Sequence, residues 1–445
     1  MPSTSTSTTT SVFETRESQV RSYCREWPAV FTSAQGVYQY AEDGSRYIDF
    51  FSGAGALNYG HNHPELKRHL IDYLAGDGVT HSLDTYTVAK REFLETFEEV
   101  VLAPRGLDYV VQFPGPTGTN SVETALKIAR KCTGRQDVVS FTNAFHGMTL
   151  GSLAVTGNSM KRAGAGTPLY HSSTAPYDDY FDGETPDFMW LERTWSDSGS
   201  GLDLPAAVIV ETVQGEGGLK AARGVWLREL AALCRRHDVL LIVDDVQAGC
   251  GRTGRFFSFE EAGIVPDIVC LSKSISGYGL PMSLTLMRRD LDQWEPGEHN
   301  GTFRGHNPAF VTATAALRTF WTDGAIEQNV AARAHQLRDG LQRIIARSDG
   351  ATLRGRGLLA GVAFEDVEVA GRIQAAAFER GLLVETSGPS GEVVKVMPAL
   401  TITEAEMAEG LEILVDAASA VLRRTDGTAD AAPTVAADRE PAFAG

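Results

Sequence analysis

Three ionisable residues stand where apolar runs in the middle of the chain end. Lys273 ends "DIVCLSK", Asp244 ends "VLLIVD" and Glu211 ends "AAVIVE". A lysine in such a place is either a surface residue just past a strand or a desolvated amine with a lowered pKa, which is suited to forming a Schiff base. A carboxylate behind an apolar run needs a partner, because an unpaired charge is costly to bury. An amine and an acid at strand ends are the groups that Schiff-base chemistry requires.

A single cofactor could use both Asp244 and Lys273. Pyridoxal phosphate (PLP) forms a Schiff base with a lysine and needs a carboxylate that keeps its pyridine nitrogen protonated, so that the ring can act as an electron sink. One strand-end acid is ambiguous, since acids also cap helices. The pairing with a lysine on a neighbouring strand favours the cofactor. Asp245 is expected to point away from Asp244 and to pair with a nearby arginine.

Other segments offer a phosphate site and a ring platform. "GPTGTN" (115–120) opens a helix that is predicted to begin near Asn120, with Glu123 in the position of a capping-box acid. Free N–H groups at a helix N-terminus bind phosphate, although a glycine-rich helix entry alone is a weak signal. Phe145 is either a core aromatic or a surface on which a planar ring stacks. The histidines of "GHNHP" lack a third ligand at recognisable spacing, so we expect a turn and no metal.

Buried strands and amphipathic helices must position these residues. Strands are expected at 206–211, 239–244 and 267–273, and a helix at 224–238 separates the first two. This order predicts right-handed βαβ units in a mostly parallel sheet. In such sheets the chemistry gathers at the carboxyl ends of the strands, which is where the lysine and the acids stand.

The composition excludes several classes of protein. The chain has 445 residues, 57 of them acidic and 40 basic, and its net charge of −17 argues against a nucleic-acid or anionic-membrane surface. No apolar run is long enough to span a membrane, and "MPSTSTSTTTS" does not resemble a secretory signal. Five scattered cysteines without a CxxC motif favour a reducing compartment. We therefore expect a cytoplasmic protein that binds neither nucleic acid nor membrane.

Several motifs occur in the order in which one known family carries them. They are "GVYQYAEDGSRYIDF", "GHNHPEL", "NSVETALKIAR", "FHGMTLGSL", "ETVQGEGG", "VDDVQAGCGRTG", "SKSISGYGLP" and "NGTFRGHNP". From about Gly36 to Leu422 the chain resembles the class III, ω-type aminotransferases that depend on PLP.

The resemblance implies an α/β fold of fold type I. A large domain with a mostly parallel central sheet flanked by helices is expected over 75–330. A smaller α+β domain is expected from both chain ends, 13–74 and 331–423. The remaining segments, 1–12 and 424–445, have the composition of disordered tails.

The resemblance also assigns residues to the cofactor. The expected contacts are Gly118, Thr119, Phe145, Glu211, Asp244, Val246, Gln247, Lys273 and Thr302. In this assignment Lys273 forms the Schiff base and Asp244 partners the pyridine nitrogen. Phe145 and Val246 cover the two faces of the ring, and Gln247 bonds its phenolic oxygen. Gly118 and Thr119 hold the phosphate. Thr302 corresponds to a threonine that reaches in from a neighbouring subunit, so at least a homodimer is expected.

Departures from the family pattern concern the substrate. Glu216 matches an acid that, in ornithine-type relatives, pairs with a gating arginine, but "EVVKVMPAL" places Lys395 at the position of that arginine. A lysine cannot make a planar bidentate grip on a carboxylate, so the gating role is in doubt. Ala54 stands near the position of a substrate-facing tyrosine. Arg304 replaces a common glycine and is expected to bring positive charge near the substrate.

Longer segments resemble one subfamily, the diaminobutyrate–2-oxoglutarate aminotransferases of the ectoine-pathway type. These segments are "FFSGAGALNYGHNHP" and "GCGRTGRFFSFEEAGIVPDIVCLSKSISGYGLP". The resemblance implies ping-pong transfer of an ω-amino group from L-glutamate to L-aspartate 4-semialdehyde, which gives L-2,4-diaminobutyrate and 2-oxoglutarate. The alternative is a class III enzyme for another ω-amine, such as 4-aminobutyrate, ornithine or lysine.

Overall fold

The structure, a computed structural model, describes residues 11–181 and 187–425. The expected tails, 1–12 and 424–445, lie outside this part of the chain except at their inner ends. Residues 11 and 12 begin helix α1 (Ser11–Arg16), and residues 424 and 425 end helix α14 (Glu404–Thr425). The described part of the chain thus starts and ends in helices.

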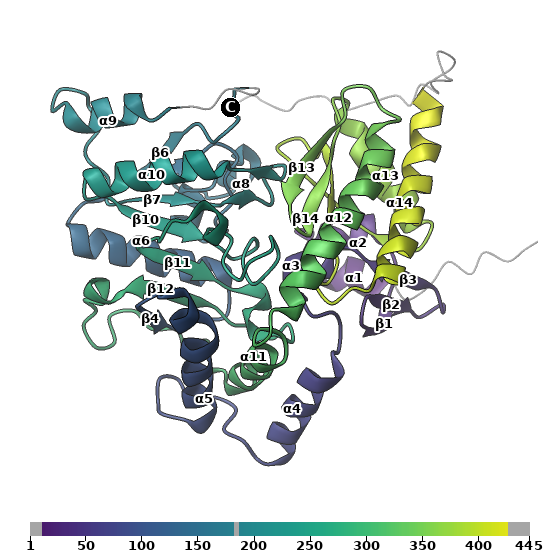
Figure 1. The fold of residues 1–445 in the computed structure, drawn as a ribbon, viewed down its shortest axis with the longest axis horizontal. Coiled ribbons are helices and arrows are strands. Elements are labelled where there is room, and N and C mark those ends of the chain that lie inside the picture. The colour runs from purple at the N-terminus through teal and green to yellow at the C-terminus, as the bar shows by residue number, and fades with distance from the viewer. Residues whose placement is uncertain (1–10, 182–186, 426–445) are drawn as a thin grey trace, which may run out of the picture.

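A seven-stranded sheet forms the centre of the larger half of the molecule (Figure 1), in the strand order β4-β12-β11-β10-β7-β5-β6. Only β12 runs antiparallel to its neighbours. The strands are β4 (Tyr109–Gln112), β5 (Val138–Phe141), β6 (Ser172–Ala175), β7 (Ala207–Val210), β10 (Leu240–Asp244), β11 (Ile268–Leu271) and β12 (Leu284–Arg288). The predicted mostly parallel sheet and its three central strands are confirmed.

The two faces of this sheet are covered by different helices, because alternate residues of a strand point to opposite faces. Ile242 of β10 belongs to the apolar cluster that contains α6 (Gly118–Thr133). Val243, the next residue, belongs to the cluster that contains α10 (Gly224–Arg236). Full burial of each such side chain stabilises the fold by about 1.5–3 kcal/mol. The carboxyl edge of the sheet is thereby fixed between two helix layers.

Helix α6 begins two residues earlier than the sequence predicts. Its N-cap is Thr117, whose N–H and hydroxyl groups both donate to Asn120 Oδ1, at 3.2 and 2.8 Å. Glu123 instead accepts hydrogen bonds from the Thr149 hydroxyl and from the Ser152 N–H. The predicted capping-box role of Glu123 is therefore wrong, because Asn120 lies one turn closer to the cap.

Two smaller sheets fill the other half, and both chain ends contribute to them. The first has β1 (Phe31–Gln35), β2 (Tyr38–Ala41), β3 (Arg46–Asp49) and β15 (Leu382–Leu383). The second has β13 (Thr352–Arg356), β14 (Leu359–Ala363), β17 (Val393–Val396) and β16 (Glu385–Ser387). Because β15 pairs with β3 in parallel, a strand near the C-terminus completes the sheet that the N-terminal strands begin.

Helices α12 (Ala325–Ile345) and α13 (Val367–Phe378) pack against α14 beside these sheets. Since α12 runs without a break across residue 330, the expected domain boundary falls inside a helix, and the division into domains stays a prediction. The remaining helices are α2 (Tyr23–Glu26), α3 (Ser52–Gly55), α4 (Pro64–Ala75), α5 (Val88–Phe97), α7 (Leu150–Ala154), α8 (Ser159–Ala163), α9 (Met189–Ser196) and α11 (Asn307–Phe320). A short antiparallel pair, β8 (Val213–Gln214) and β9 (Lys220–Ala221), follows β7.

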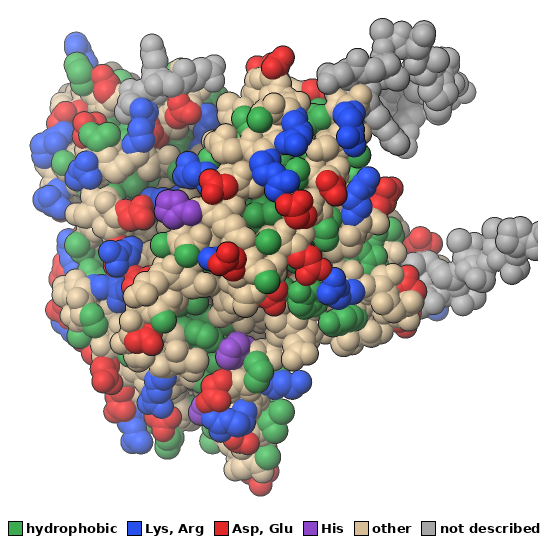
Figure 2. Space-filling view, turned by 45° about the vertical axis from the view of Figure 1, so that its right-hand side comes forward, with side chains coloured by type: hydrophobic (Ala, Val, Ile, Leu, Met, Phe, Trp, Pro, Cys, Tyr) green, Lys and Arg blue, Asp and Glu red, His purple; other side chains and the backbone are tan. Residues whose placement is uncertain are grey.

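The surface in Figure 2 carries acidic and basic side chains interspersed, without a broad area of one sign on that face. Hydrophobic side chains are scattered among them. None of the helices in the described ranges is both long enough and apolar enough to cross a membrane.

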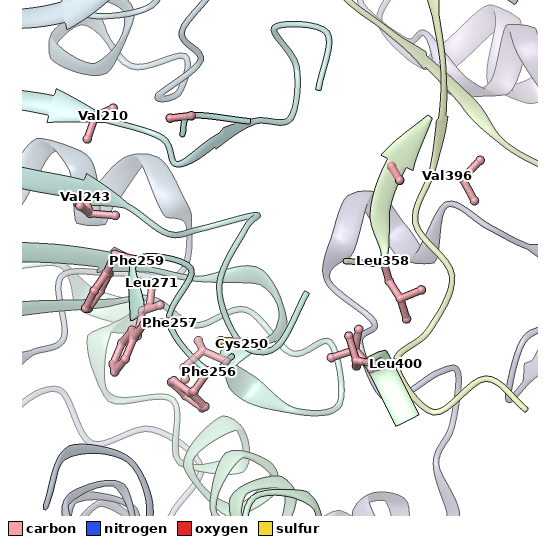
Figure 3. Packing of buried hydrophobic residues seen from close by; sticks show 14 of the residues in the cluster. Val210, Val243, Cys250, Phe256, Phe257, Phe259, Leu271, Leu358, Val396 and Leu400 are labelled. Atoms are coloured by element: carbon pink, nitrogen blue, oxygen red, sulfur yellow. The ribbon is translucent and has the colours of Figure 1, made fainter. Parts of the chain in front are cut away.

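A buried arginine joins the two halves of the molecule. Arg252 donates hydrogen bonds to the carbonyl oxygen of Pro398, to that of Leu358 at 3.2 Å and to Asn58 Oδ1 at 2.6 Å. Burial lowers the pKa of Arg252 to about 9. Figure 3 shows the apolar core continuing from Val210 and Val243 of the large sheet, past Cys250, to Leu358 and Leu400 of the smaller half. Arg252 therefore donates hydrogen bonds to oxygen atoms that would otherwise be buried in this core without a donor.

Replacing Arg252 with methionine is expected to lower the free energy of unfolding by about 3 kcal/mol, because several buried oxygens lose their donor. Urea-induced unfolding measures the change. Arg91→Ala is the control: Arg91 is exposed and only weakly paired with Glu95 at 3.9 Å, so it should change stability by less than about 0.5 kcal/mol. Equal effects of the two substitutions would contradict the role of Arg252.

Candidate active site

One cavity opens at the carboxyl ends of β7, β10 and β11, beside the N-terminus of α6. Its lining residues are Gly118, Thr119, Phe145, His146, Gly147, Glu211, Val213, Glu216, Asp244, Val246, Gln247, Ala248 and Lys273. Every cofactor contact expected from the sequence is among them except Thr302. The structure thus brings together residues that are far apart in the chain.

Lys273 begins a short 3₁₀ turn directly after β11 and adopts a left-handed backbone conformation, with φ of 52°. Its Nζ donates to the carbonyl oxygen of Ala54 at 2.9 Å. Burial, aided by the positive charge of Lys395, lowers the pKa of Lys273 to about 8 even though Glu216 acts in the opposite direction. Left-handed residues cost free energy and cluster at functional sites. Lys273 has the lowered pKa of a nucleophilic amine.

Asp244, the last residue of β10, is held by two hydrogen bonds. Its Oδ2 lies 2.7 Å from Nδ1 of His146, and its Oδ1 accepts from the Val246 N–H at 3.1 Å. Burial alone would lower the pKa of His146, but the hydrogen bond to Asp244 and the charges of Asp244 and Glu211 raise it above its ordinary value. The carboxylate of Asp244 thus has a fixed orientation and a fully buried partner.

Glu211 orders the aromatic wall of the cavity. Its Oε2 accepts a hydrogen bond from the Phe145 N–H at 2.9 Å. Burial raises the pKa of Glu211 to about 8, so the side chain is mostly protonated at neutral pH. The Lys161 Nζ lies over the Phe145 ring, 4.3 Å from its centroid. The position of Phe145 is therefore set from its backbone and from its ring.

The N-terminus of α6 comes close to the loop after β10. A Cβ atom on Gly118 would lie 2.9 Å from Val246 Cγ1, which is closer than real side chains approach. The Thr119 hydroxyl bonds Thr149 and Ser152 at 2.7 and 2.9 Å. Only glycine at position 118 leaves this end of the cavity open, with the free backbone donors of the helix facing it.

Gln247 and Glu216 line the side of the cavity next to Lys273. The Gln247 Nε2 donates to the Ala54 carbonyl oxygen at 3.1 Å and to Glu216 Oε1 at 3.4 Å. Glu216 Oε1 also accepts from Lys395 Nζ at 2.9 Å. The acid and the lysine at the family's gating positions are thus paired.

Comparison with known proteins agrees with this geometry. A family model described as aminotransferase class III matches residues 21–418. Two relatives called diaminobutyrate–2-oxoglutarate transaminase, from Streptomyces avermitilis and Oceanobacillus iheyensis, are 66% and 56% identical, over 92% and 93% of this chain and 97% of each relative. The chain is a class III aminotransferase.

Solved structures support the same family. The ornithine aminotransferase of Toxoplasma gondii, described with PLP at partial occupancy in its active site, superposes with a TM-score of 0.81 at 27% identity, and 94% of each chain is covered. An N-acetylornithine aminotransferase from Stenotrophomonas maltophilia superposes with a TM-score of 0.72 at 28% identity, over 93% of this chain and 100% of that one. The expected fold class is confirmed.

PLP is the cofactor of this aminotransferase, and the cavity fits it. A lysine and an aspartate, Lys273 and Asp244, line the same space. Two buried atoms, His146 Nε2 and Gln247 Oε1, have no hydrogen-bond partner within the described residues. The helix end at Gly118 supplies backbone donors to an anion. The individual contacts assigned to these residues stay predictions, including that of Gln247, whose Nε2 is engaged by Ala54 and Glu216.

Three sequence-derived residues lie outside the cavity lining. Thr302 accepts a hydrogen bond at its carbonyl oxygen from His81 Nε2 at 2.6 Å, and its expected reach to another subunit is untested. Arg304 forms an ion pair with Asp84. Lys395 is fully buried behind Glu216. Of the three, Lys395 is joined to the cavity through a lining residue.

Sequence reasoning missed some partners and misassigned one. Nothing local signals the bond of His146 to Asp244, since the two residues come from distant segments. Asp245 does not pair with an arginine: its Oδ2 accepts from the Ser258 N–H at 3.0 Å, and burial raises its pKa to about 7. No group of three His, Cys, Asp or Glu side chains within 11–181 and 187–425 is arranged to hold a metal ion.

The lowered pKa of Lys273 predicts how the apoenzyme takes up PLP. Only the neutral amine attacks an aldehyde, and with a pKa of about 8 roughly one amine in ten is neutral at pH 7, against about one in three thousand for an ordinary lysine. The association rate, followed by stopped-flow absorbance, is expected to rise about tenfold between about pH 7 and pH 9. A rate that keeps rising tenfold per pH unit beyond pH 9 would contradict the lowered pKa.

Proposed function

We propose that this aminotransferase interconverts L-aspartate 4-semialdehyde plus L-glutamate with L-2,4-diaminobutyrate plus 2-oxoglutarate. The observation that carries the chemistry is that Lys273 and Asp244 line one cavity. The substrate pair is supported by relatives called diaminobutyrate–2-oxoglutarate transaminase, which are 54–66% identical over more than nine tenths of the chain.

The residues divide the work between them. PLP, when bound, supplies an electron sink for the bonds of the reacting carbon. Lys273 Nζ takes the proton from the substrate carbon that bears the amine, a role for which a pKa of about 8 is well matched to neutral pH. Asp244 holds negative charge at the end of β10, and His146 fixes its direction. Phe145, tied to Glu211, closes one side and excludes water.

The charge of Asp244 is tested by Asp244→Asn, which keeps the shape and the acceptor for the Val246 N–H. We expect kcat to fall by about 10²- to 10⁴-fold while PLP still binds. Asp245→Asn is the matched control, because its carboxyl group, with a pKa of about 7, is already half protonated at neutral pH. Steady-state kinetics measure both variants, and a similar loss in both would rule out a special role for Asp244.

The substrate assignment is tested with a panel of amine donors. L-2,4-Diaminobutyrate, 4-aminobutyrate, ornithine and lysine are each supplied with 2-oxoglutarate, and glutamate formation is followed. Diaminobutyrate is expected to give the highest kcat/KM, and Lys273→Ala, which lacks the reacting amine, to give no turnover with any donor. A higher kcat/KM for ornithine or 4-aminobutyrate would overturn the substrate and leave the reaction class standing.

We also propose a cytoplasmic homodimer whose product enters ectoine synthesis. The dimer is supported by the resemblance of Thr302 to a threonine that acts in a neighbouring subunit. All five cysteines lie in the described ranges and are free, as in a reducing compartment. The ectoine pathway is supported by the subfamily motifs of the sequence.

A further inference from the structure

A buried lysine beside the cavity is shared by two carboxylates. Lys395 on β17 is fully buried, and its Nζ lies 2.9 Å from Glu216 Oε1 and 2.9 Å from Glu385 Oε1. Glu385 stands directly opposite Lys395 on the neighbouring strand β16. Glu216 comes from the turn between β8 and β9, in the other half of the molecule. The cluster thus joins one cation to two anions across the two halves.

The two carboxylates differ in what they can reach. The Glu385 side chain is only 4% exposed, and its Oε2 accepts from the Tyr23 hydroxyl at 3.4 Å. The Glu216 side chain is 27% exposed and lines the cavity together with Lys273. A molecule in the cavity therefore meets Glu216, whereas Glu385 and Lys395 lie behind it.

The charges of the cluster keep the carboxylate of Glu216 ionised at the cavity wall. Burial would raise the pKa of Glu216, but Lys395 and Lys273 outweigh it and lower the pKa to about 2. The pKa of Lys395 is raised because the two carboxylates outweigh its burial. Burial and the charge of Glu216 raise the pKa of Glu385. At neutral pH Glu216 is ionised and Lys395 is charged, so the surface offered to a ligand is a carboxylate.

Such a surface distinguishes ligands by the charge at their non-reacting end. L-2,4-Diaminobutyrate is 4-aminobutyrate with an added ammonium group at carbon 2, and aspartate 4-semialdehyde carries the same ammonium. A carboxylate in a partly buried cavity attracts an ammonium and hydrogen-bonds it. Lys395 is held behind Glu216 by Glu385, which contacts it from the adjacent strand.

We propose that Glu216 binds the ammonium group at the non-reacting end of the diamine, and that Lys395, which Glu385 also contacts, holds Glu216 in place. This proposal rests on the proposed function and adds the residue that selects diaminobutyrate over 4-aminobutyrate. Glu216 contacts the substrate, and Glu385 is a positioning residue that acts through Lys395.

The test compares two donors in one enzyme, so that a general loss of folding or chemistry cancels. The measured quantity is the ratio of kcat/KM for diaminobutyrate to kcat/KM for 4-aminobutyrate. Glu216→Gln is expected to lower this ratio about 10- to 100-fold, the worth of one charge-assisted hydrogen bond. Glu216→Asp, which keeps the charge, should restore part of it. Glu392→Gln is the control, since Glu392 pairs with Arg354 away from the cavity lining. An unchanged ratio in Glu216→Gln would overturn the proposal.

The positioning role is tested with Glu385→Gln, which should lower the same ratio by raising KM for diaminobutyrate more than it lowers kcat. If this variant does not fold, Glu385→Gln combined with Lys395→Met removes both buried charges together and avoids an unpaired one. This double variant should also lower the ratio, because Glu216 loses the Lys395 ammonium group that holds it in place. A wild-type ratio in the variant that folds would refute the role of Glu385.

Two further measurements separate this proposal from the proposed function. Calorimetric binding of diaminobutyrate to the PLP-loaded Lys273→Ala enzyme should weaken about tenfold or more when Glu216→Gln is added, and equal binding would contradict the contact. In the wild-type enzyme, glutamate alone should change the absorbance of bound PLP. If it does not, the aminotransferase assignment fails, whatever Glu216 binds.

Discussion

Charged groups in and beside the cavity are buried away from water, and the need to give each of them a partner determines how the site is built. An unpaired buried charge costs several kcal/mol. Asp244 accordingly bonds a histidine, and Lys395 lies between two acids. Lys273 has no partner of comparable strength, and burial shifts its pKa instead. The reactive amine is thus left only partly compensated for its burial, which is also the condition under which an amine reacts at neutral pH.

The sequence predicts the framework of this arrangement better than its contacts. Continuous apolar runs and the helix between two of them predicted the strands β7, β10 and β11. The residues at the ends of these strands predicted the cavity that Lys273 and Asp244 share. Hydrogen-bond and ion-pair partners that depend on tertiary packing could not be predicted from the sequence. His146 and Glu385 carry no local mark of their bonds to Asp244 and Lys395, because those bonds join segments that only the folded chain brings together. The capping role expected for Glu123 failed because a nearer residue competes for the same helix end.

The glycine-rich segment "GPTGTN", which is a weak sequence motif by itself, lies at the cavity because its main chain must pass close to another segment. Gly118 lies where any side chain would strike Val246. Ala54 brings its carbonyl oxygen to both Lys273 and Gln247 from a left-handed conformation, with φ of 56°. In both places the backbone does what a side chain does elsewhere. A small residue matters at these positions because it leaves room for the main chain to come close. A search for functional side chains does not reveal such a position.

The parallel pairing of β15 with β3 also bears on how the chain is made. Strands β1 to β3 leave the ribosome early, whereas residues 382–383 follow only after the whole large sheet has been synthesised. Contacts of such long sequence separation form slowly, because the chain between them must be ordered first. During translation the N-terminal hairpin therefore has an open edge, and the half of the molecule that holds Lys395 cannot close until the last strands arrive.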